Sequence, residues 1–349
     1  MSSPRGIRDS ALWQLTKQRI VVFLREPEAV FWVIVFPIAL AFALGVSFRS
    51  NADAPVYAGV LEGAGSAELL TSMAADAGIR ARVVTEASAE KALRDGDVQV
   101  IVVPGQPPTY RFDPARPESR LARLTVDAAL QRAAGRTDRF AARQQPVQLV
   151  GSRYIDWLIP GLLGMNIMGT GVWGVAFSIV TARGKKLLKR FLATPMRKSD
   201  YLWAQVLARF SFLAVEVVIL LVFAWAVFGV SVKGSWILLG AVCVIGSLAF
   251  TALGLLAASR VTTIEGVSGL VNLMLVPMWI LSGVFFSYTR FPDAALPFIR
   301  ALPLTALNDA LRAVMLEGAA LPALAGPLLV LLVWGAASFA LALKIFRWR

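Results

Sequence analysis

Long apolar runs separated by polar segments dominate the chain. A helix needs about 20 apolar residues to cross the hydrocarbon core of a bilayer. Runs of this length, interrupted by charge only at Glu216 in the third, lie at 29–48, 157–182, 210–232, 235–259, 266–289 and 319–343. The first follows too much charged sequence, and is itself too long, for a cleavable signal peptide. The pattern predicts an all-α polytopic membrane protein with six transmembrane helices.

The basic residues of the short loops predict its orientation. The loop 183–200, between the second and third runs, carries seven Lys and Arg residues against one acid, Asp200, whereas the next loop contains only Lys233. Cytoplasmic loops of membrane proteins are enriched in Lys and Arg. With six spans, both termini are therefore expected in the cytoplasm.

Residues 49–156 are mostly polar and lie outside the cytoplasm in this topology. β-branched content predicts strands at 56–61, 80–85 and 98–103, and helical periodicity predicts helices at 66–77, 87–94 and 117–144. About 100 residues can bury a core of their own. We expect a small α/β extracytoplasmic domain between the first two spans, with the other five spans in residues 157–349.

The segment 1–28 has helical periodicity from residue 7 onward. Apolar side chains, such as Leu12 and Phe23, fall on one side, and Lys17 falls on the other. This pattern is typical of an amphipathic helix at the cytoplasmic membrane surface. A plain cytosolic tail is the alternative.

Residues 291–318 contain two apolar helical stretches that are too short to cross a membrane. Thr305 can cap the second stretch and Gly318 can end it. Non-helical backbone at membrane depth must be covered by protein or water. We expect a re-entrant hairpin against the outer ends of the helices, with a surface loop as the alternative. The residues that mark this hairpin are Pro297, Pro303, Thr305, Asn308 and Arg312.

The composition narrows the classes of function. The chain is 57% hydrophobic and 16% charged, where soluble domains carry about 25% charged residues. Its net charge of +13 could indicate nucleic acid, but the basic residues lie between apolar runs, so a lipid bilayer is the expected partner and nucleic acid is not.

Several kinds of chemistry are excluded. The chain has one cysteine, Cys243, and no histidine, which rules out internal disulfides and His-based catalysis and argues against a metal site. It contains no GxxxxGK[ST] phosphate-binding loop, so it is not its own ATPase. We expect no catalytic residue and no cofactor in this chain.

The cytoplasmic loop 183–200 combines basic and apolar residues. A short helix over 185–193 is expected to stop at Thr194 and Pro195. Its apolar side chains are too few to cross a membrane, yet they give a surface that a protein partner can bury. Anchoring to anionic lipid head groups, worth about 1 kcal/mol per basic residue, explains the pattern equally well.

Glu216 is the one ionisable residue deep within a predicted span. A carboxylate there costs about 2.5–3.5 kcal/mol on insertion, so we expect Glu216 to face the bundle interior. Arg209 lies two turns earlier and is expected to be too far for an easy direct contact. Asn166 and Asn272 are further polar residues within spans. Together with Glu216 they are candidates for a translocation pathway, or else for hydrogen bonds between helices.

The second span is rich in glycine. Small residues permit close helix packing or a contact between subunits. Its glycines are Gly161, Gly164, Gly169, Gly171 and Gly174.

Four stretches of the chain resemble the ABC-2 type transport permeases, the membrane subunits of bacterial ABC exporters, and together the resemblance covers essentially the whole chain. They are FLREPEAVFWVIVFP (23–37), LIPGLLGMNIMGTGVWG (158–174), LLKRFLATPMRKSDYLWAQ (187–205) and SGVFFSYTRFPDAALPFIRALPLTALNDALRAVM (282–315).

The resemblance implies a subunit of a bacterial inner-membrane exporter for an amphipathic or hydrophobic, drug-like or lipid-like substrate. It implies two copies of this chain, or one with a paralogue, joined to a pair of ATPase subunits that bind ATP and Mg. Many members have an acidic residue with Gly-Thr before the docking helix, but residues 182–186 read ARGKK. The implied docking residues are Lys185, Lys186, Leu187, Leu188, Lys189, Arg190, Phe191, Leu192, Thr194, Pro195 and Met196.

Two other interpretations fit the residues. An ion-coupled transporter or channel using Glu216 would be expected to show inverted repeats, and none is evident between the halves. A membrane scaffold without transport activity would present the external domain to a partner.

Overall fold

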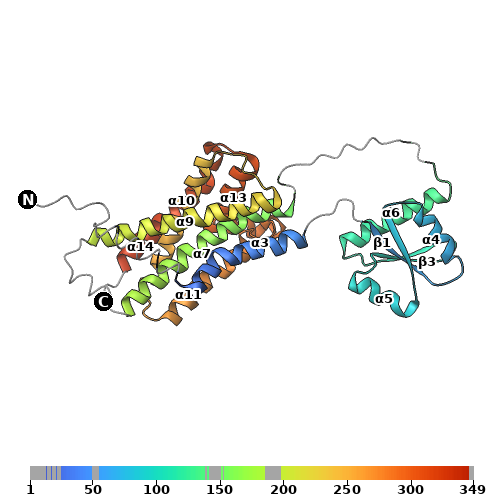
Figure 1. Ribbon diagram of the computed structural model, residues 1–349, viewed down its shortest axis with the longest axis horizontal. Coiled ribbons are helices and arrows are strands. Elements are labelled where there is room, and N and C mark those ends of the chain that lie inside the picture. The colour runs from blue at the N-terminus through green and yellow to red at the C-terminus, as the bar shows by residue number, and fades with distance from the viewer. Residues whose placement is uncertain are drawn as a thin grey trace, which may run out of the picture. The chain divides into compact units, whose positions relative to one another are not determined.

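The computed structural model describes residues 25–48, 55–137, 151, 153–184 and 198–345, with isolated positions 13, 17, 21 and 140; side chains are not described at 29 and 198–206. The predicted docking residues 185–196 lie outside this range. The chain divides into a helical unit, residues 1–49 with 148–349, and an α/β unit, residues 50–147 (Figure 1).

Among the described residues, the helical unit has five helices that are long and apolar enough to cross a membrane. They coincide with the second to sixth predicted spans. Their bounds are α7 (Tyr154–Gly184), α9 (Lys198–Phe228), α10 (Trp236–Ala258), α11 (Ile264–Leu281) and α14 (Ala325–Ile345), the last preceded by the 3-10 helix η6 (Leu321–Leu324).

The first predicted span has a different form. Its helix begins as α2 (Pro27–Val30), widens into the π-helix η2 (Phe31–Val35) and continues as α3 (Phe36–Ser47). The apolar part, Phe31–Ser47, is shorter than the other five helices. The widening fits the sequence, because Pro37 has no backbone N–H to bond the carbonyl four residues earlier.

The predicted N-terminal amphipathic helix is described only at a few positions. Trp13, Lys17 and Val21 are helical. The helix does not run unbroken to residue 28, because Glu26 has non-helical backbone angles and Pro27 starts α2. A residue before proline disfavours the helical conformation, which explains the break.

Helix α7 is the centre of the helical unit, with α3, α9, α10 and α11 packed against it. Three of its glycines permit this packing: a methyl group at Gly161 would meet the Val284 carbonyl, and one at Gly171 would meet Phe250. At Gly164 it would overlap the side-chain oxygen of Asn308. Gly169 and Gly174, also predicted as packing positions, face open space within this chain.

The segment before α14 forms two short helices, α12 (Leu296–Arg300) and α13 (Pro303–Arg312). They follow the 3-10 helices η3 (Tyr288–Arg290) and η4 (Asp293–Ala295), and α13 continues into the π-helix η5 (Ala313–Glu317). Helix α13 packs against α7, α10, α11 and α14. Helix α13 is therefore buried structure and not a surface loop, whereas η4 and most of α12 are exposed.

Polar side chains of α13 hold it in place. Asn308 is fully buried and its Nδ2 donates to the Ser282 carbonyl over 3.0 Å. The Arg312 guanidinium lies 3.5 Å from the ring centroid of Trp157 and donates to the Gly283 carbonyl. Because both carbonyls lie just after α11, these bonds fasten the hairpin to the end of that helix.

The ends of α13 agree only in part with the sequence interpretation. Gly318 ends the helical segment in the left-handed conformation, with φ 67°, as predicted. The prediction that Thr305 caps the second helix is wrong: Leu302 is the N-cap, and Thr305 lies buried inside α13. The helix starts earlier because Pro303 has a suitable φ for the first turn and needs no partner for a backbone N–H there.

The α/β unit is built on one sheet with strand order β2-β1-β3-β4. Strands β1 and β2 are parallel, as are β1 and β3, while β4 runs antiparallel to β3. The elements are β1 (Val56–Leu61), α4 (Ser66–Ala74), β2 (Ile79–Val84), α5 (Glu86–Asp95), β3 (Val100–Val103), β4 (Thr109–Arg111) and α6 (Pro117–Ala133).

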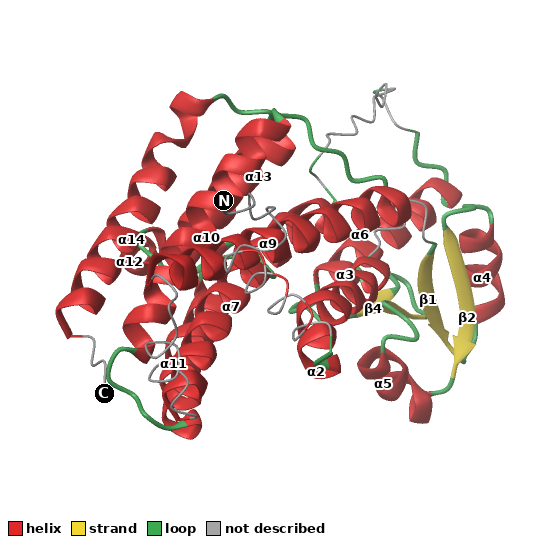
Figure 2. Ribbon diagram, turned by 60° about the vertical axis from the view of Figure 1, so that its left-hand side comes forward, coloured by secondary structure: helices red, strands yellow, loops and turns green. Residues whose placement is uncertain are grey.

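Helices cover the two faces of this sheet unequally (Figure 2). Helices α4 and α6 share a core with one face, around Val60, Met73 and Val126. On the other face, α5 shares a smaller core around Val84 and Ile101. The three predicted strands are present, but β4 was not predicted because three residues give too little alternation to recognise a strand.

The close approach at Gly164 generates a prediction. Gly164→Ala forces the buried Asn308 side chain to move and should destabilise the protein by about 1–3 kcal/mol, the usual range for overpacking. Gly169→Ala is the matched control on the same helix, since nothing occupies the space there. Thermal unfolding of both purified variants in detergent measures the difference. Equal midpoints would contradict the described packing.

Candidate functional site

A cluster of buried polar side chains joins three of the long helices. Arg209 and Glu216 lie on α9, Thr170 on α7 and Ser247 on α10. Arg209 Nη1 is 3.2 Å from Glu216 Oε1, and Arg209 Nε donates to Ser247 Oγ over 3.0 Å. Thr170 Oγ1 donates to the other Glu216 oxygen, Oε2, over 3.2 Å. The cluster therefore ties α7, α9 and α10 together in their interior.

The expectation that Arg209 is too far from Glu216 is wrong. Seven residues are about two turns of an α-helix, so both side chains leave the same face. Side chains on a helix lean toward its N-terminus, which directs Glu216 toward Arg209. The long arginine side chain spans the remaining distance.

The pairing offsets the free-energy cost of burying each of the two charges. The side chains of Arg209 and Glu216 are 12% and 2% exposed. A charge is tolerated in such a place only when a partner and hydrogen bonds replace its water. Arg209 Nη2 also donates to the Ile167 carbonyl over 3.3 Å, so the guanidinium has contacts on several sides. The pair is a satisfied junction within the described residues.

Asn166 lies beside this cluster and bonds the backbone of the first helical segment. Its Nδ2 donates to the Val33 carbonyl over 3.0 Å. In an α-helix that carbonyl would accept the N–H of the residue four positions later, which is Pro37 and has none. Asn166 on α7 thus supplies the bond that proline removes from the first helical segment.

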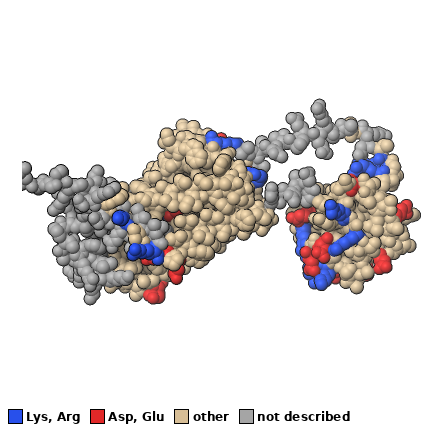
Figure 3. Space-filling model, viewed as in Figure 1, with Lys and Arg blue, Asp and Glu red and all other residues tan. Residues whose placement is uncertain are grey.

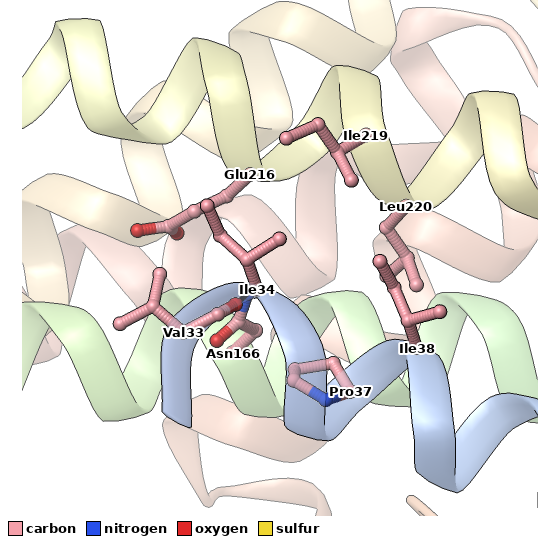
Figure 4. A pocket seen from close by; sticks show the side chains of 8 residues that line it. All are labelled: Val33, Ile34, Pro37, Ile38, Asn166, Glu216, Ile219 and Leu220. Atoms are coloured by element: carbon pink, nitrogen blue, oxygen red, sulfur yellow. Dashed lines mark hydrogen bonds between the residues drawn. The ribbon is translucent and has the colours of Figure 1, made fainter. Parts of the chain in front are cut away.

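A small cavity lies between these groups (Figure 4). Its volume of about 10 Å³ is close to the minimum of about 10–15 Å³ that one water molecule requires. It is too small for a transported molecule. It is lined by Val33, Ile34, Pro37 and Ile38 of the first helical segment, Asn166 of α7, and Glu216, Ile219 and Leu220 of α9.

The three pathway candidates are not brought together. Asn166 and Glu216 line the same cavity, but Asn272 is not among its lining residues and is exposed on α11. Sequence reasoning did not single out Thr170 and Ser247. The seven-residue spacing of Arg209 and Glu216 is the signal that could have identified the ion pair.

The predicted docking loop is described only at its two ends, where α7 ends at Gly184 and α9 starts at Lys198. Just before the loop, Arg183 Nη1 donates to the Ala258 carbonyl over 3.1 Å and to the Val261 carbonyl. These bonds join the end of α7 to the connection between α10 and α11.

The ion pair predicts non-additive mutations. Arg209→Met or Glu216→Leu alone should destabilise the protein by about 3–5 kcal/mol, because each leaves a buried charge unpaired. The double variant should cost much less than the sum of the two. Chemical unfolding of the four proteins in detergent measures this coupling. Additive effects would show that the two side chains do not depend on one another.

The bond from Asn166 predicts a rescue. Asn166→Leu leaves the Val33 carbonyl without its partner and should cost about 1–2 kcal/mol. Pro37→Ala restores a backbone N–H to that helix, so the same Asn166→Leu change should cost less in this background. Thermal unfolding of the single and double variants tests this, and an equal cost in both backgrounds would contradict the assignment.

Comparison with known proteins identifies the family to which the helical unit is similar. Residues 125–316 match the family model described as ABC-2 type transporter. The match runs from within α6 to the end of η5, and so includes α7, α9, α10, α11 and the α12–α13 hairpin.

Two relatives show more limited similarity. The chain is 28% identical over 172 residues to ABC transporter G family member 20 of Dictyostelium discoideum, covering 49% of this chain and 23% of the relative. It is 27% identical over 156 residues to the inner membrane transport permease YadH of Escherichia coli K12, covering 41% and 59%. The chain thus spans less than two thirds of either relative.

The family match covers more than half of the chain and includes four of its five long apolar helices. This is a multi-pass membrane protein, and it belongs to the ABC-2 type transporter family.

Proposed function

We propose that the chain is the permease subunit of an ABC exporter. A separate ATPase subunit binds ATP and Mg and drives the transport of an amphipathic or hydrophobic, drug-like or lipid-like substrate out of the cytoplasm or the inner leaflet. The helical segment Pro27–Ser47 is the first of six spans, and both termini lie on the cytoplasmic side of a bacterial inner membrane.

The observation that carries this proposal is the pair of long helices on either side of the basic loop. The family match includes both α7 and α9. Each has 31 residues, where about 20 suffice to cross a bilayer. Helix α9 begins at Lys198, well before its apolar run starts at residue 210, so its first turns extend past the apolar region next to the loop that we propose a partner binds in the cytoplasm.

The contacts of α7 provide a route for movement from that loop. Arg183 connects the start of the loop to the α10–α11 connection, and the Arg209–Glu216 cluster connects α7, α9 and α10 further along. A displacement of the docked loop therefore moves these helices as a group. Because Glu216 is held by Arg209 and Thr170, its contacts favour this mechanical role over ion binding.

The exposed face of α11 suggests where a second copy or a paralogue packs. Asn272 and Leu273 are exposed there, the latter by 72%. An uncharged polar side chain directed at lipid is unfavourable, since hydrocarbon offers it no hydrogen bond. We place the second permease subunit on this face, with the substrate path between the two copies and Asn272 beside it.

An affinity pull-down of the tagged chain from gently solubilised membranes tests the proposal. A stoichiometric ATPase should co-purify, and its amount should fall several-fold for Phe191→Ala and Arg190→Gln, which remove an apolar and a charged docking group. Lys233→Gln, on the predicted opposite side of the membrane, is the control. A pure protein without nucleotide-dependent activity, or docking variants that retain the ATPase and full transport, would overturn it.

A further inference from the structure

Half of one face of the α/β sheet has no helix over it among the described residues. Helix α5 packs its Ala89 and Ala92 with Val84 and Ile101. Toward the start of β1 and β2 the same face instead carries Tyr57, which is 44% exposed. Parallel sheets are normally buried on both faces. The uncovered half is therefore a feature that calls for a functional explanation.

The strand register brings an aromatic ring and two guanidinium groups together here. Tyr57 of β1 is paired with Arg80 of β2, and Gly59 with Arg82. Side chains alternate between the faces of a sheet, so Tyr57, Arg80 and Arg82 lie on one face. Gly59 has no side chain, and the side chains of Val84 and Ile101 lie over it, so they border this group of residues on the side of α5.

These residues surround a hollow of about 290 Å³, close to the lower end of the range of about 300–1,000 Å³ for small-molecule sites. The lining residues are Tyr57, Arg80, Ala81, Arg82, Asp97 and Val98. Figure 3 shows basic and acidic side chains close together on the visible surface of this unit.

The charges of the lining favour an anion. Arg80 and Arg82 face one lining acid, Asp97, which is 3.4 Å from Arg82. The side chains of that pair are 56% and 62% exposed, so their attraction is weak and an incoming anion can compete for Arg82. Guanidinium groups match the planar fork of a carboxylate or phosphate, and a tyrosine ring offers an apolar face.

We propose that this hollow binds a small ligand in which an oxyanion group is attached to a flat apolar body. Arg80 and Arg82 bind the oxyanion, and Tyr57 packs against the body. Asp97 competes with the ligand for Arg82 and so weakens binding. The assignment does not depend on the transport function, because it rests on the α/β unit alone.

Phenyl phosphate and inorganic phosphate are suitable probes, since both carry the phosphate oxyanion and only phenyl phosphate has an apolar body. The full chain is purified in a non-ionic detergent, and ³¹P line broadening of each probe is measured against empty micelles. Phenyl phosphate should bind, and Arg80→Gln/Arg82→Gln should weaken it at least tenfold. Tyr57→Ala should weaken phenyl phosphate but leave inorganic phosphate unchanged. Arg94→Gln, an exposed arginine of α5 outside the hollow, is the matched control.

Asp97→Asn provides a test that loss of folding cannot imitate. Removing the competing carboxylate should tighten phenyl phosphate binding several-fold. Broadening that persists in the double arginine variant, or an Asp97→Asn variant that binds no better than the original chain, would overturn the proposal. Equal binding of the two phosphates would overturn the role of Tyr57.

Discussion

Arg209 and Glu216 neutralise one another inside the helical unit, and the arrangement of α7, α9 and α10 depends on that pairing. Neither charge is stable there alone, because a charge that leaves water loses its hydration and needs a partner charge and hydrogen bonds to replace it. The surrounding bonds to Thr170 and Ser247 complete the cluster. The ion pair thus permits two charged residues in an apolar bundle, and its bonds to Thr170 and Ser247 join α9 to α7 and α10.

The same constraint recurs at two other irregular parts of this unit's backbone. Pro37 deprives the Val33 carbonyl of its helical partner, and Asn166 replaces it. The carbonyls of Ser282 and Gly283, just beyond α11, are bonded by Asn308 and Arg312 of the hairpin. Without water, each break in a helix needs a side chain from another segment. These side chains consequently connect distant parts of the chain.

The two units offer different kinds of chemistry. In the helical unit the Arg209–Glu216 cluster joins three helices through side-chain bonds, which suits the proposed movement of these helices as a group. In the α/β unit the hollow beside Tyr57 keeps two guanidinium groups accessible. Helices that move as a group and an α/β unit that binds an anionic ligand are compatible parts of the exporter proposed above.

The sequence by itself determined the features that depend on local pattern. The length of the apolar runs predicted six spans, of which five are full-length helices among the described residues. The β-branched content predicted β1 to β3, and the freedom of glycine predicted the end of the hairpin at Gly318. Only the tertiary structure decided which polar groups meet. Asn166 reaches Val33 across 133 positions of sequence, and Arg209 reaches Ser247 across 38. Such pairings depend on how the helices pack against one another. Helix packing produces no local sequence pattern that identifies the partner of a polar residue.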